Sequence, residues 1–181
     1  MDKILSAFAF LILFSLQLSA QEESVEEVPL KKHSFTLSIG HTHIGEGVSN
    51  GKKRSLVLPS WGFNYDFHID DNWSIGLHND LIIEQFEVEV EGKDNVLVTI
   101  DRSRPISIAL TASYRLNKFL ILSAGTGQEI APEETFTIFR VGVEPYVELP
   151  NNFEILGTFA IDFRVDAYNA INFALGIAKK F

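Results

Sequence analysis

Apolar and polar residues alternate with a period of two in eight segments of this chain. The clearest segment is 61–68, where the odd positions are all aromatic (Trp61, Phe63, Tyr65 and Phe67) and the even positions are small, polar or charged. Successive side chains of a β-strand point to opposite faces, so the pattern predicts strands with one apolar and one polar face. The turn-forming residues 70–72 then separate this segment from the next alternating run.

The alternation predicts eight strands, at about 34–44, 56–69, 73–90, 96–116, 119–128, 135–149, 153–165 and 171–181. The connections after the second, fourth and sixth strands are short turns, whereas the other connections are longer or follow strands that extend further. Short turns at one end and longer loops at the other are typical of outer-membrane barrels, with the turns in the periplasm. An even number of strands then places both termini of the chain on the periplasmic side.

Two features disturb the regular pattern. The apolar parity changes near Glu84-Gln85, which predicts a β-bulge. Residues 86–100 would then form a hairpin above the membrane, with Glu87, Glu89 and Glu91 on one side. Prolines lie within three predicted strands and oppose regular pairing there: Pro59, Pro105 and Pro145.

The pattern predicts an all-β fold, an eight-stranded antiparallel up-and-down transmembrane β-barrel with lipid outside and polar residues inside. The alternative is a soluble, secreted or periplasmic lipid-binding barrel, in which the apolar face would point inward. The aromatic residues on one face of segments 61–67 and 73–77 exceed the volume that a small calyx can hold. This volume favours the membrane barrel.

The ends of the chain predict export. Residues 1–20 have an apolar run and the exit Leu18-Ser19-Ala20, which predicts a signal peptide cleaved after Ala20, with a retained membrane helix as the alternative. Residues 21–33 would be a disordered periplasmic lead, and 34–181 the barrel. The chain has no Cys, which excludes disulfides and thiol chemistry. Its net charge of −9, without a basic stripe, argues against nucleic-acid binding.

The last strand, Ile171-Asn172-Phe173-Ala174-Leu175-Gly176-Ile177-Ala178-Lys179-Lys180-Phe181, alternates and ends on an aromatic residue. With the signal and the eight strands, it resembles the small eight-stranded outer-membrane barrels of Gram-negative bacteria, over about residues 34–181. The resemblance implies a bacterial outer-membrane location, contact with lipids including lipopolysaccharide, and recognition of Phe181 by the barrel-assembly machinery. The group contains anchors, adhesins, porin-like proteins and lipid A enzymes, so the fold does not choose among these functions.

Charged residues on the inward parity are the first candidate site. Such charges must be paired or hydrated, so they predict an interior filled by ion pairs and small water pockets. A narrow gated path for solutes is the functional alternative. The predicted inward set is Asp66, His68, His78, Asp80, Glu84, Arg115, Arg140, Glu144, Glu148, Glu154, Asp162, Arg164 and Lys180.

Two further motifs fall near the predicted extracellular rim. His41 and His43 share the outward face, but no third metal ligand is identifiable. A lipid A deacylase of this fold would have Ser two residues after His, and here His43 occupies that position, so the nucleophile is missing. The run 52–54 (Lys-Lys-Arg), with Arg102 and Arg104 at similar height, would face lipopolysaccharide phosphates or form a solvated charge run.

The sequence therefore predicts a monomeric integral outer-membrane protein with a structural or surface-interaction role and a filled polar interior. It assigns no catalytic, cofactor-binding or metal-binding residues, and we expect neither a cofactor nor enzymatic activity. The alternatives are a porin-like narrow channel and a lipid A-modifying enzyme.

Overall fold

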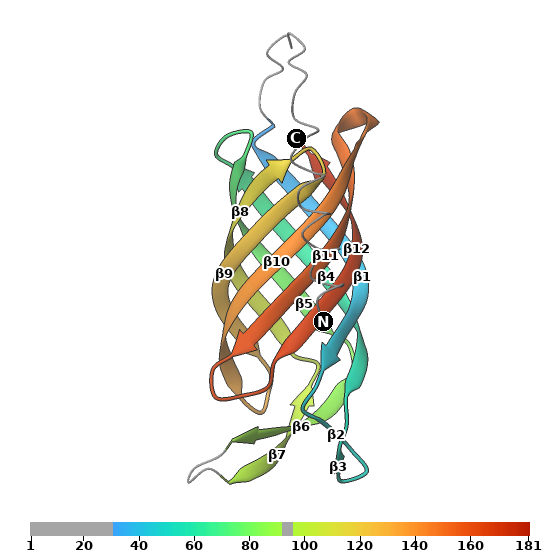
Figure 1. Ribbon diagram of the computed structural model, residues 1–181, viewed down its shortest axis with the longest axis vertical. Helices are drawn as coiled ribbons and strands as arrows, with labels where there is room; N and C mark the ends of the chain where they lie inside the picture. Colours follow the sequence, from blue (N-terminus) through green and yellow to red (C-terminus); the bar gives the residue numbers. More distant parts are fainter. Residues whose placement is uncertain (1–30, 92–95) are drawn as a thin grey trace, which may run out of the picture.

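A computed structural model describes residues 31–91 and 96–181 of the protein. The predicted signal peptide, 1–20, and residues 21–30 of the predicted lead lie outside the described residues. Eight strands close into an antiparallel barrel in the order β1-β12-β11-β10-β9-β8-β5-β4 (Figure 1). They are β1 (His33–Ile44), β4 (Leu56–His68), β5 (Trp73–Ile82), β8 (Ile106–Asn117), β9 (Leu120–Ile130), β10 (Thr135–Leu149), β11 (Phe153–Arg164) and β12 (Ala170–Lys180). The predicted fold class is confirmed.

The first and last strands close the barrel. β1 pairs with β12 from Ser34↔Lys180 to Ile44↔Ala170. We call the end where β1 begins and β12 finishes the terminal end, and the opposite end the sheet end. At the terminal end, the connections within β4–β5, β8–β9 and β10–β11 are two to four residues long. The last of these contains the 3₁₀ turn η2 (Pro150–Asn152), where Asn151 adopts a positive φ of 63°.

The two faces of the barrel wall have the predicted polarity. Along β10, apolar side chains point outward. Phe139 is 53% exposed, whereas the adjacent Arg140 points inward and is 4% exposed. The same alternation runs through the neighbouring strands, with Ile155 and Phe159 outward and Asp162 inward on β11. A lipid-binding calyx would show the reverse, so this alternative is wrong.

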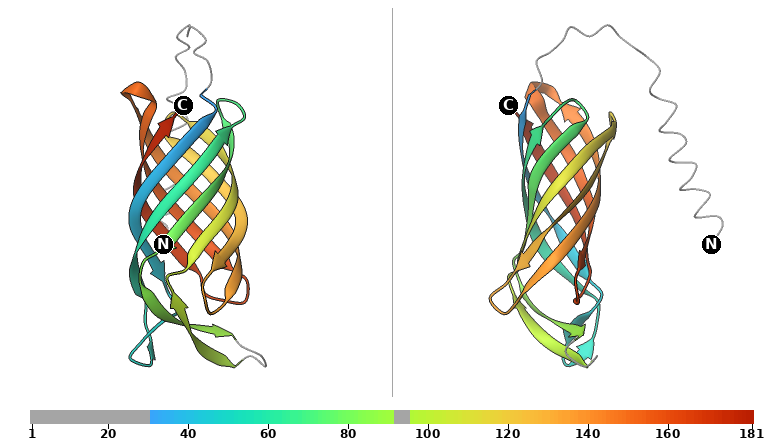
Figure 2. Two further views of the ribbon diagram at one scale, coloured as in Figure 1. Left: turned by 180° about the vertical axis from the view of Figure 1, so that it is seen from behind. Right: turned by 90° about the vertical axis from the view of Figure 1, so that its left-hand side faces the viewer.

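A second, four-stranded sheet covers the sheet end (Figure 2). We call it the cap sheet; its order is β3-β2-β6-β7, from β2 (Gly47–Ser49), β3 (Lys52–Lys53), β6 (Gln85–Glu91) and β7 (Leu97–Ser103). Phe86, Val88 and Val90 of β6 pack on residues of the barrel mouth that include Ile44 and Phe136. The predicted 86–100 hairpin therefore exists, but one of its faces is buried against the barrel.

The irregular positions have local explanations. Instead of a single bulged strand, the chain breaks at Ile83-Glu84, between β5 and β6. Pro105 lies in the corresponding break between β7 and β8. The carbonyl of Pro59 accepts a hydrogen bond from the amide of Ile83, which follows the last residue of β5. Proline has no backbone N–H to donate in return, and this gap falls where the β4–β5 ladder ends.

Pro145 lies where the pairing between β10 and β11 is interrupted. The β10–β11 pairing runs to Val143↔Phe159 and resumes at Tyr146↔Leu156, so Pro145 has no partner on β11, although it pairs with Leu120 of β9. Gly157 lies opposite, and a Cβ there would come within 3.4 Å of the Pro145 ring. The absence of a side chain at Gly157 therefore makes room for the ring.

Within the described residues, no helix has the length and hydropathy to cross a membrane.

Candidate functional site

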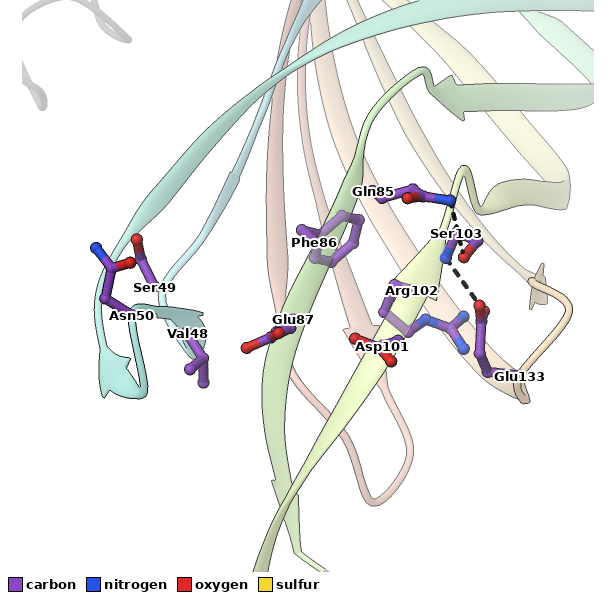
Figure 3. A pocket seen from close by; sticks show the side chains of 10 residues that line it. All are labelled: Val48, Ser49, Asn50, Gln85, Phe86, Glu87, Asp101, Arg102, Ser103 and Glu133. Carbon is purple, nitrogen blue, oxygen red and sulfur yellow. Dashed lines mark hydrogen bonds between the residues drawn. The ribbon is translucent and has the colours of Figure 1, made fainter.

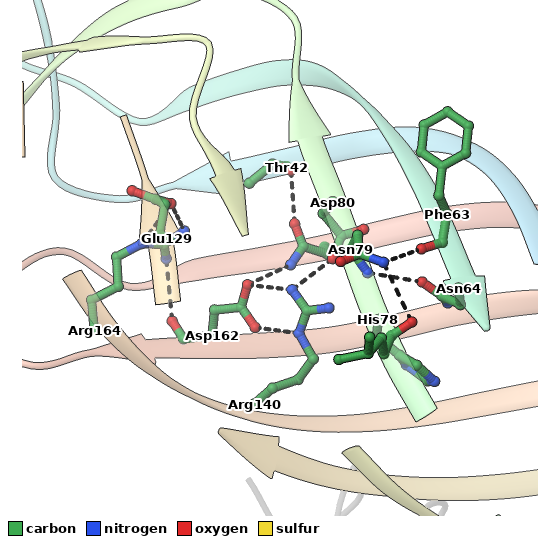
Figure 4. Close-up of polar contacts among 12 residues, drawn as sticks. Thr42, Phe63, Asn64, His78, Asn79, Asp80, Glu129, Arg140, Asp162 and Arg164 are labelled. Atoms are coloured by element: carbon green, nitrogen blue, oxygen red, sulfur yellow. Dashed lines mark hydrogen bonds and ion pairs between the residues drawn. The ribbon is translucent and has the colours of Figure 1, made fainter. Parts of the chain in front are cut away.

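The candidate site is the set of polar side chains that project into the barrel lumen. They form four clusters between the sheet end and the terminal end. Figure 4 shows Glu129 and Arg164 of the first cluster, Asp80, Arg140 and Asp162 of the second, and His78 of the third. Each cluster joins side chains from strands that are not neighbours in the barrel wall, so the contacts cross the lumen.

The mouth cluster is centred on Glu129, which is fully buried near the end of β9. Arg102, from β7 of the cap sheet, donates from Nη2 to Glu129 Oε1 at 2.6 Å. Arg164, at the end of β11, donates from Nε to Glu129 Oε2 at 2.8 Å, and a second bond from its Nη2 reaches the same oxygen. One carboxylate thus accepts hydrogen bonds from two buried guanidinium groups, and it ties the cap sheet to the barrel wall.

Aromatic rings complete this cluster. The Tyr168 hydroxyl donates to Glu129 Oε1 at 2.5 Å, and the Arg164 guanidinium lies 4.4 Å from the Tyr168 ring centroid. Arg102 lies 4.7 Å from the Phe136 ring, in a second cation–π contact. Burial raises the pKa of Tyr168, in the loop between β11 and β12, so its hydroxyl stays protonated and remains a donor.

The central cluster is built around Arg140 on β10. Its Nε and Nη2 donate to the two carboxylate oxygens of Asp162 at 2.6 and 2.7 Å, a bidentate pair. Its Nη2 also lies 2.6 Å from Asp80 Oδ2 on β5. Asn172 donates to Asp162 at 3.2 Å and accepts from Thr42 at 2.7 Å. The hydrogen bonds therefore link β5, β10, β11, β12 and β1 through the interior.

The third cluster surrounds His78 on β5. Its Nε2 lies 3.0 Å from Asp66 Oδ1 on β4, and its Nδ1 lies 3.9 Å from Glu144 Oε1 on β10. Asp66 pairs with Gly76 across the ladder, and a Cβ at Gly76 would overlap the Asp66 carboxylate. The glycine therefore lets the carboxylate lie over the backbone and reach His78, two residues further along the same face.

The fourth cluster closes the terminal end. Arg115 Nη1 donates to Glu148 at 2.8 Å and to the Tyr146 hydroxyl at 2.8 Å, and its Nη2 donates to Glu154 at 3.2 Å. Lys180 Nζ lies 2.6 Å from Glu154. Beyond these pairs, an open cleft of about 550 Å³ is lined by residues that include Arg115 and Lys180.

The structure places most of the predicted inward charges in these clusters, with one clear error. Glu84 is exposed in the break between β5 and β6, because the chain leaves the barrel wall there. Glu148 lies at the rim, where its side chain is 64% exposed. Ten predicted residues are in the ion-paired clusters: Asp66, His78, Asp80, Arg115, Arg140, Glu144, Glu154, Asp162, Arg164 and Lys180. His68 also points inward and bonds to Ser34 at 3.1 Å.

Sequence reasoning missed Glu129 and misplaced Arg102. Glu129 continues the inward parity of Ser123, Gly125 and Gly127, so extending the predicted strand 119–128 by one residue would have found it. Arg102 is fully buried against Glu129, so its expected position facing lipopolysaccharide phosphates is wrong. This burial follows from the folding of the β6–β7 hairpin over the mouth, a contact between segments that strand periodicity does not reveal.

The outer surface of the sheet end carries the remaining predicted cations. The side chains of Lys52, Lys53, Arg54 and Arg104 are exposed. Beside them, a cleft of about 560 Å³ opens between β2, the β6–β7 hairpin and Glu133 (Figure 3). The Ser103 amide donates to Glu133 Oε2 at 3.1 Å, and hydrogen bonding from Ser103 lowers the pKa of the Glu133 carboxyl.

His41 and His43 point outward on β1, with ring centroids 6.4 Å apart. The His43 and Phe173 rings form a T-shaped pair, with centroids 5.2 Å apart and an interplanar angle of 74°. Over residues 31–91 and 96–181, no three or more His, Cys, Asp or Glu side chains gather in a way that could hold a metal ion.

Comparison with solved structures identifies the fold. The N-terminal β-barrel domain of Pseudomonas aeruginosa OprF superposes with a TM-score of 0.53 at 12% identity, over 82% of this chain and 97% of that domain. Ail, the attachment invasion locus protein of Yersinia pestis, superposes with a TM-score of 0.52 at 14% identity, over 84% of this chain and all of that one. No family model matches the sequence, and no curated protein matches it. The chain therefore has the fold of small eight-stranded outer-membrane β-barrels.

Proposed function

From this shared fold, we propose that the chain is an integral protein of the bacterial outer membrane, whose interior is closed by its own side chains and whose cap sheet is a surface-interaction module. The observation that carries the proposal is the Arg102–Glu129 pair, in which a cap-sheet residue fills the barrel mouth. A protein that conducted solutes would need that space. A protein that displayed a sheet on a rigid support would need such an anchor.

The length of the connections supports the orientation. The terminal end has turns of two to four residues, whereas the sheet end carries the cap sheet and the loop of residues 165–169. In outer-membrane barrels, short turns face the periplasm and longer connections face outward. The proposed orientation therefore puts the cap sheet outside the cell.

The closed interior follows from the energetics of buried charge. Removing one partner of a buried ion pair leaves an uncompensated charge and costs several kcal/mol, typically about 3–5. The mouth and central clusters contain such pairs, with Glu129 and Asp162 at most 1% exposed. Opening a path through them would separate these pairs, so we assign them to closure of the barrel. If solutes crossed the barrel, these clusters would instead line a narrow solute path.

The proposed location in the outer membrane implies two partners, lipopolysaccharide and the barrel-assembly machinery. Lys52, Lys53 and Arg54 are exposed at the sheet end, and we assign them to lipopolysaccharide phosphates in the outer leaflet. The barrel-assembly machinery is the proposed partner during biogenesis, through Phe181, and the folded barrel acts as a monomer. The proposal includes no catalytic role, because nucleophile, base and orienting group do not come together at His41 and His43.

Fractionation of cells that express the full chain tests the proposal. The protein should be found with outer membranes, resist carbonate extraction, and migrate differently on a gel when it is not boiled. A cysteine introduced at Lys52 should react with a membrane-impermeant maleimide on intact cells, whereas one at Asn151, in the terminal-end turn, should not. A soluble periplasmic pool, or labelling of Asn151→Cys only, would contradict the location or the orientation.

A further inference from the structure

The β7 strand is an unpaired edge of the cap sheet. In the order β3-β2-β6-β7, it pairs with β6 alone and has no strand on its other side within the described residues. Barrels close their sheets and so remove such edges, whereas the cap sheet has two edge strands, the two-residue β3 and the seven-residue β7. An exposed edge is a template for the addition of another strand.

Two hydrogen bonds establish which backbone groups of β7 face this edge. The Ser103 amide bonds to Glu133 rather than to β6, so it points away from the hairpin partner. The Glu89 amide bonds to the Glu46 carbonyl, which shows that its ladder partner Thr99 belongs to a non-hydrogen-bonded pair. Backbone direction alternates along a strand, so the N–H and C=O groups of Leu97, Thr99 and Asp101 point to the open edge.

The two faces beside this edge differ in character. Glu87 and Asp101 are directly opposite one another in the hairpin, in a non-hydrogen-bonded pair, where side chains come closest. Like charges in such a pair are destabilising. The neighbouring Glu89 has a cationic partner, Lys53, at 3.9 Å. On the other face, Val98 is 41% exposed, and Ile100 is packed partly against the mouth core.

We propose that the β7 edge binds an extended segment of a partner protein in which basic residues alternate with apolar ones. This inference rests on the proposed surface role of the cap sheet and names the class of partner. Main-chain bonds to Leu97, Thr99 and Asp101 supply the affinity, as in other complexes formed by strand addition. Basic side chains of the added strand lie beside Asp101 and Glu87, while apolar ones lie beside Val98 and Ile100.

Charge complementarity decides between this partner and a second copy of the chain. An added β7 strand would bring only its own Asp101 to the acidic face, because Arg102 points to the opposite face and is buried on Glu129. The Glu87–Asp101 repulsion would then stay uncompensated. A segment with lysine or arginine at alternate positions would relieve it.

Fluorescence anisotropy with the purified full chain in detergent micelles tests the inference. The probe is a labelled nine-residue peptide that alternates lysine and valine, and the control peptide has glutamate in place of lysine. Empty micelles give the background for each peptide. The lysine peptide should bind, with weaker binding at higher salt, and the glutamate peptide should not. Equal binding of the two peptides would overturn the proposal.

Two variants test the backbone and the charges separately. Thr99→Pro removes an edge donor that β6 does not use, so the hairpin ladder persists; affinity should fall about tenfold or more, because the central bond is lost and the ring blocks the edge. The control Thr99→Val keeps the donor and should bind within about twofold of the original chain. The double variant Glu87→Gln, Asp101→Asn should also lose affinity and most of the salt dependence.

The outcomes separate this inference from the proposed function. If Thr99→Pro binds the peptide like the original chain, or if the double variant keeps full affinity, the edge proposal is wrong, whatever the location of the protein. A concentration-dependent dimer that Thr99→Pro abolishes, without peptide binding, would assign the edge to a second copy instead. Failure of the fractionation experiment would reject the outer-membrane role and leave the peptide measurement on the purified chain unaffected. Should Thr99→Pro fail to fold, the double variant decides.

Discussion

Arg102 on the cap sheet and Glu129 on the barrel wall form an ion pair of 2.6 Å in which both side chains are 0% exposed. The pair joins two separate sheets, because β7 belongs to the cap sheet and β9 to the barrel. The carboxylate also serves Arg164 and Tyr168. The cap sheet is therefore held over the barrel mouth by a buried polar contact as well as by the apolar residues of β6.

Replacing Glu129 should destabilise the protein strongly. Glu129→Gln leaves Arg102 and Arg164 buried without a carboxylate, which should lower the free energy of unfolding by about 3–5 kcal/mol. Urea unfolding in detergent measures this change, and hydrogen exchange should rise in β6 and β7. The control is Glu148→Gln, whose side chain is 64% exposed beside Arg115 and whose loss should cost about 1 kcal/mol or less. Equal destabilisation by the two variants would contradict the anchoring role.

The contact between Asp66 and Gly76 gives a second prediction. A Cβ at Gly76 would overlap the Asp66 carboxylate and the Tyr65 carbonyl, so Gly76→Ala should cost about 1–3 kcal/mol in unfolding free energy. Gly45→Ala is the control, because a Cβ there meets no atom within 4 Å, and its effect should stay within about 0.5 kcal/mol. A Gly76→Ala variant as stable as Gly45→Ala would show that the His78 cluster tolerates displacement.

The barrel could be predicted from the sequence because its wall is governed by local alternation. The predicted strand 135–149 coincides with β10, since apolar outward positions alternate with polar or small inward ones from Phe139 to Val147. The cap sheet could not be predicted in the same way. β2 and β3 are only three and two residues long. β3 pairs with β2, and β2 pairs with β6, a tertiary pairing that leaves no periodic signal in the sequence.

The interior clusters could likewise be predicted only in part. Parity predicted that Arg140 and Asp162 point inward, because both lie on regular strands. It did not predict their partners, since contacts across a lumen depend on barrel shear and on which side chains are long enough to meet. Arg102 illustrates the limit, because its burial depends on a hairpin that leaves the wall at Ile83 and returns over the mouth.

The terminal aromatic residue should matter more for assembly in cells than for stability. Phe181 exchanges two backbone hydrogen bonds with His33, at 2.9 and 3.3 Å, and its ring stacks on the His33 ring at 5.9 Å. Phe181→Ala keeps the backbone bonds and loses one ring, worth at most about 1.5–3 kcal/mol. We expect a sharp fall of assembled barrel in cells and near-normal refolding from urea into detergent.

Phe153→Ala is the matched control for that experiment, because Phe153 is another outward aromatic residue at the terminal end. It should lose comparable stability and assemble normally. If Phe181→Ala and Phe153→Ala reduce cellular assembly equally, the terminal residue contributes stability alone.

The rim histidines should have no effect on lipid chemistry. His41→Ala and His43→Ala each remove an outward-facing ring. A lipid A deacylase of this fold would have a serine nucleophile two residues after the histidine, and neither His41 nor His43 has one. Mass spectrometry of lipid A from cells that express each variant should match that from cells with the original chain. A mass difference of one acyl chain between the original and either variant would establish an enzymatic role.

Conductance across a planar lipid bilayer tests the closed interior most directly. Purified, refolded protein whose unboiled gel mobility shows a folded barrel should produce no large, steady current, because the mouth and central clusters occupy the lumen. Glu129→Gln removes the anchor of the cap sheet, so recordings of this variant should show brief channel openings that the original chain lacks. Stable, porin-sized steps from the original chain would contradict the account and assign the ion-paired interior to a solute path.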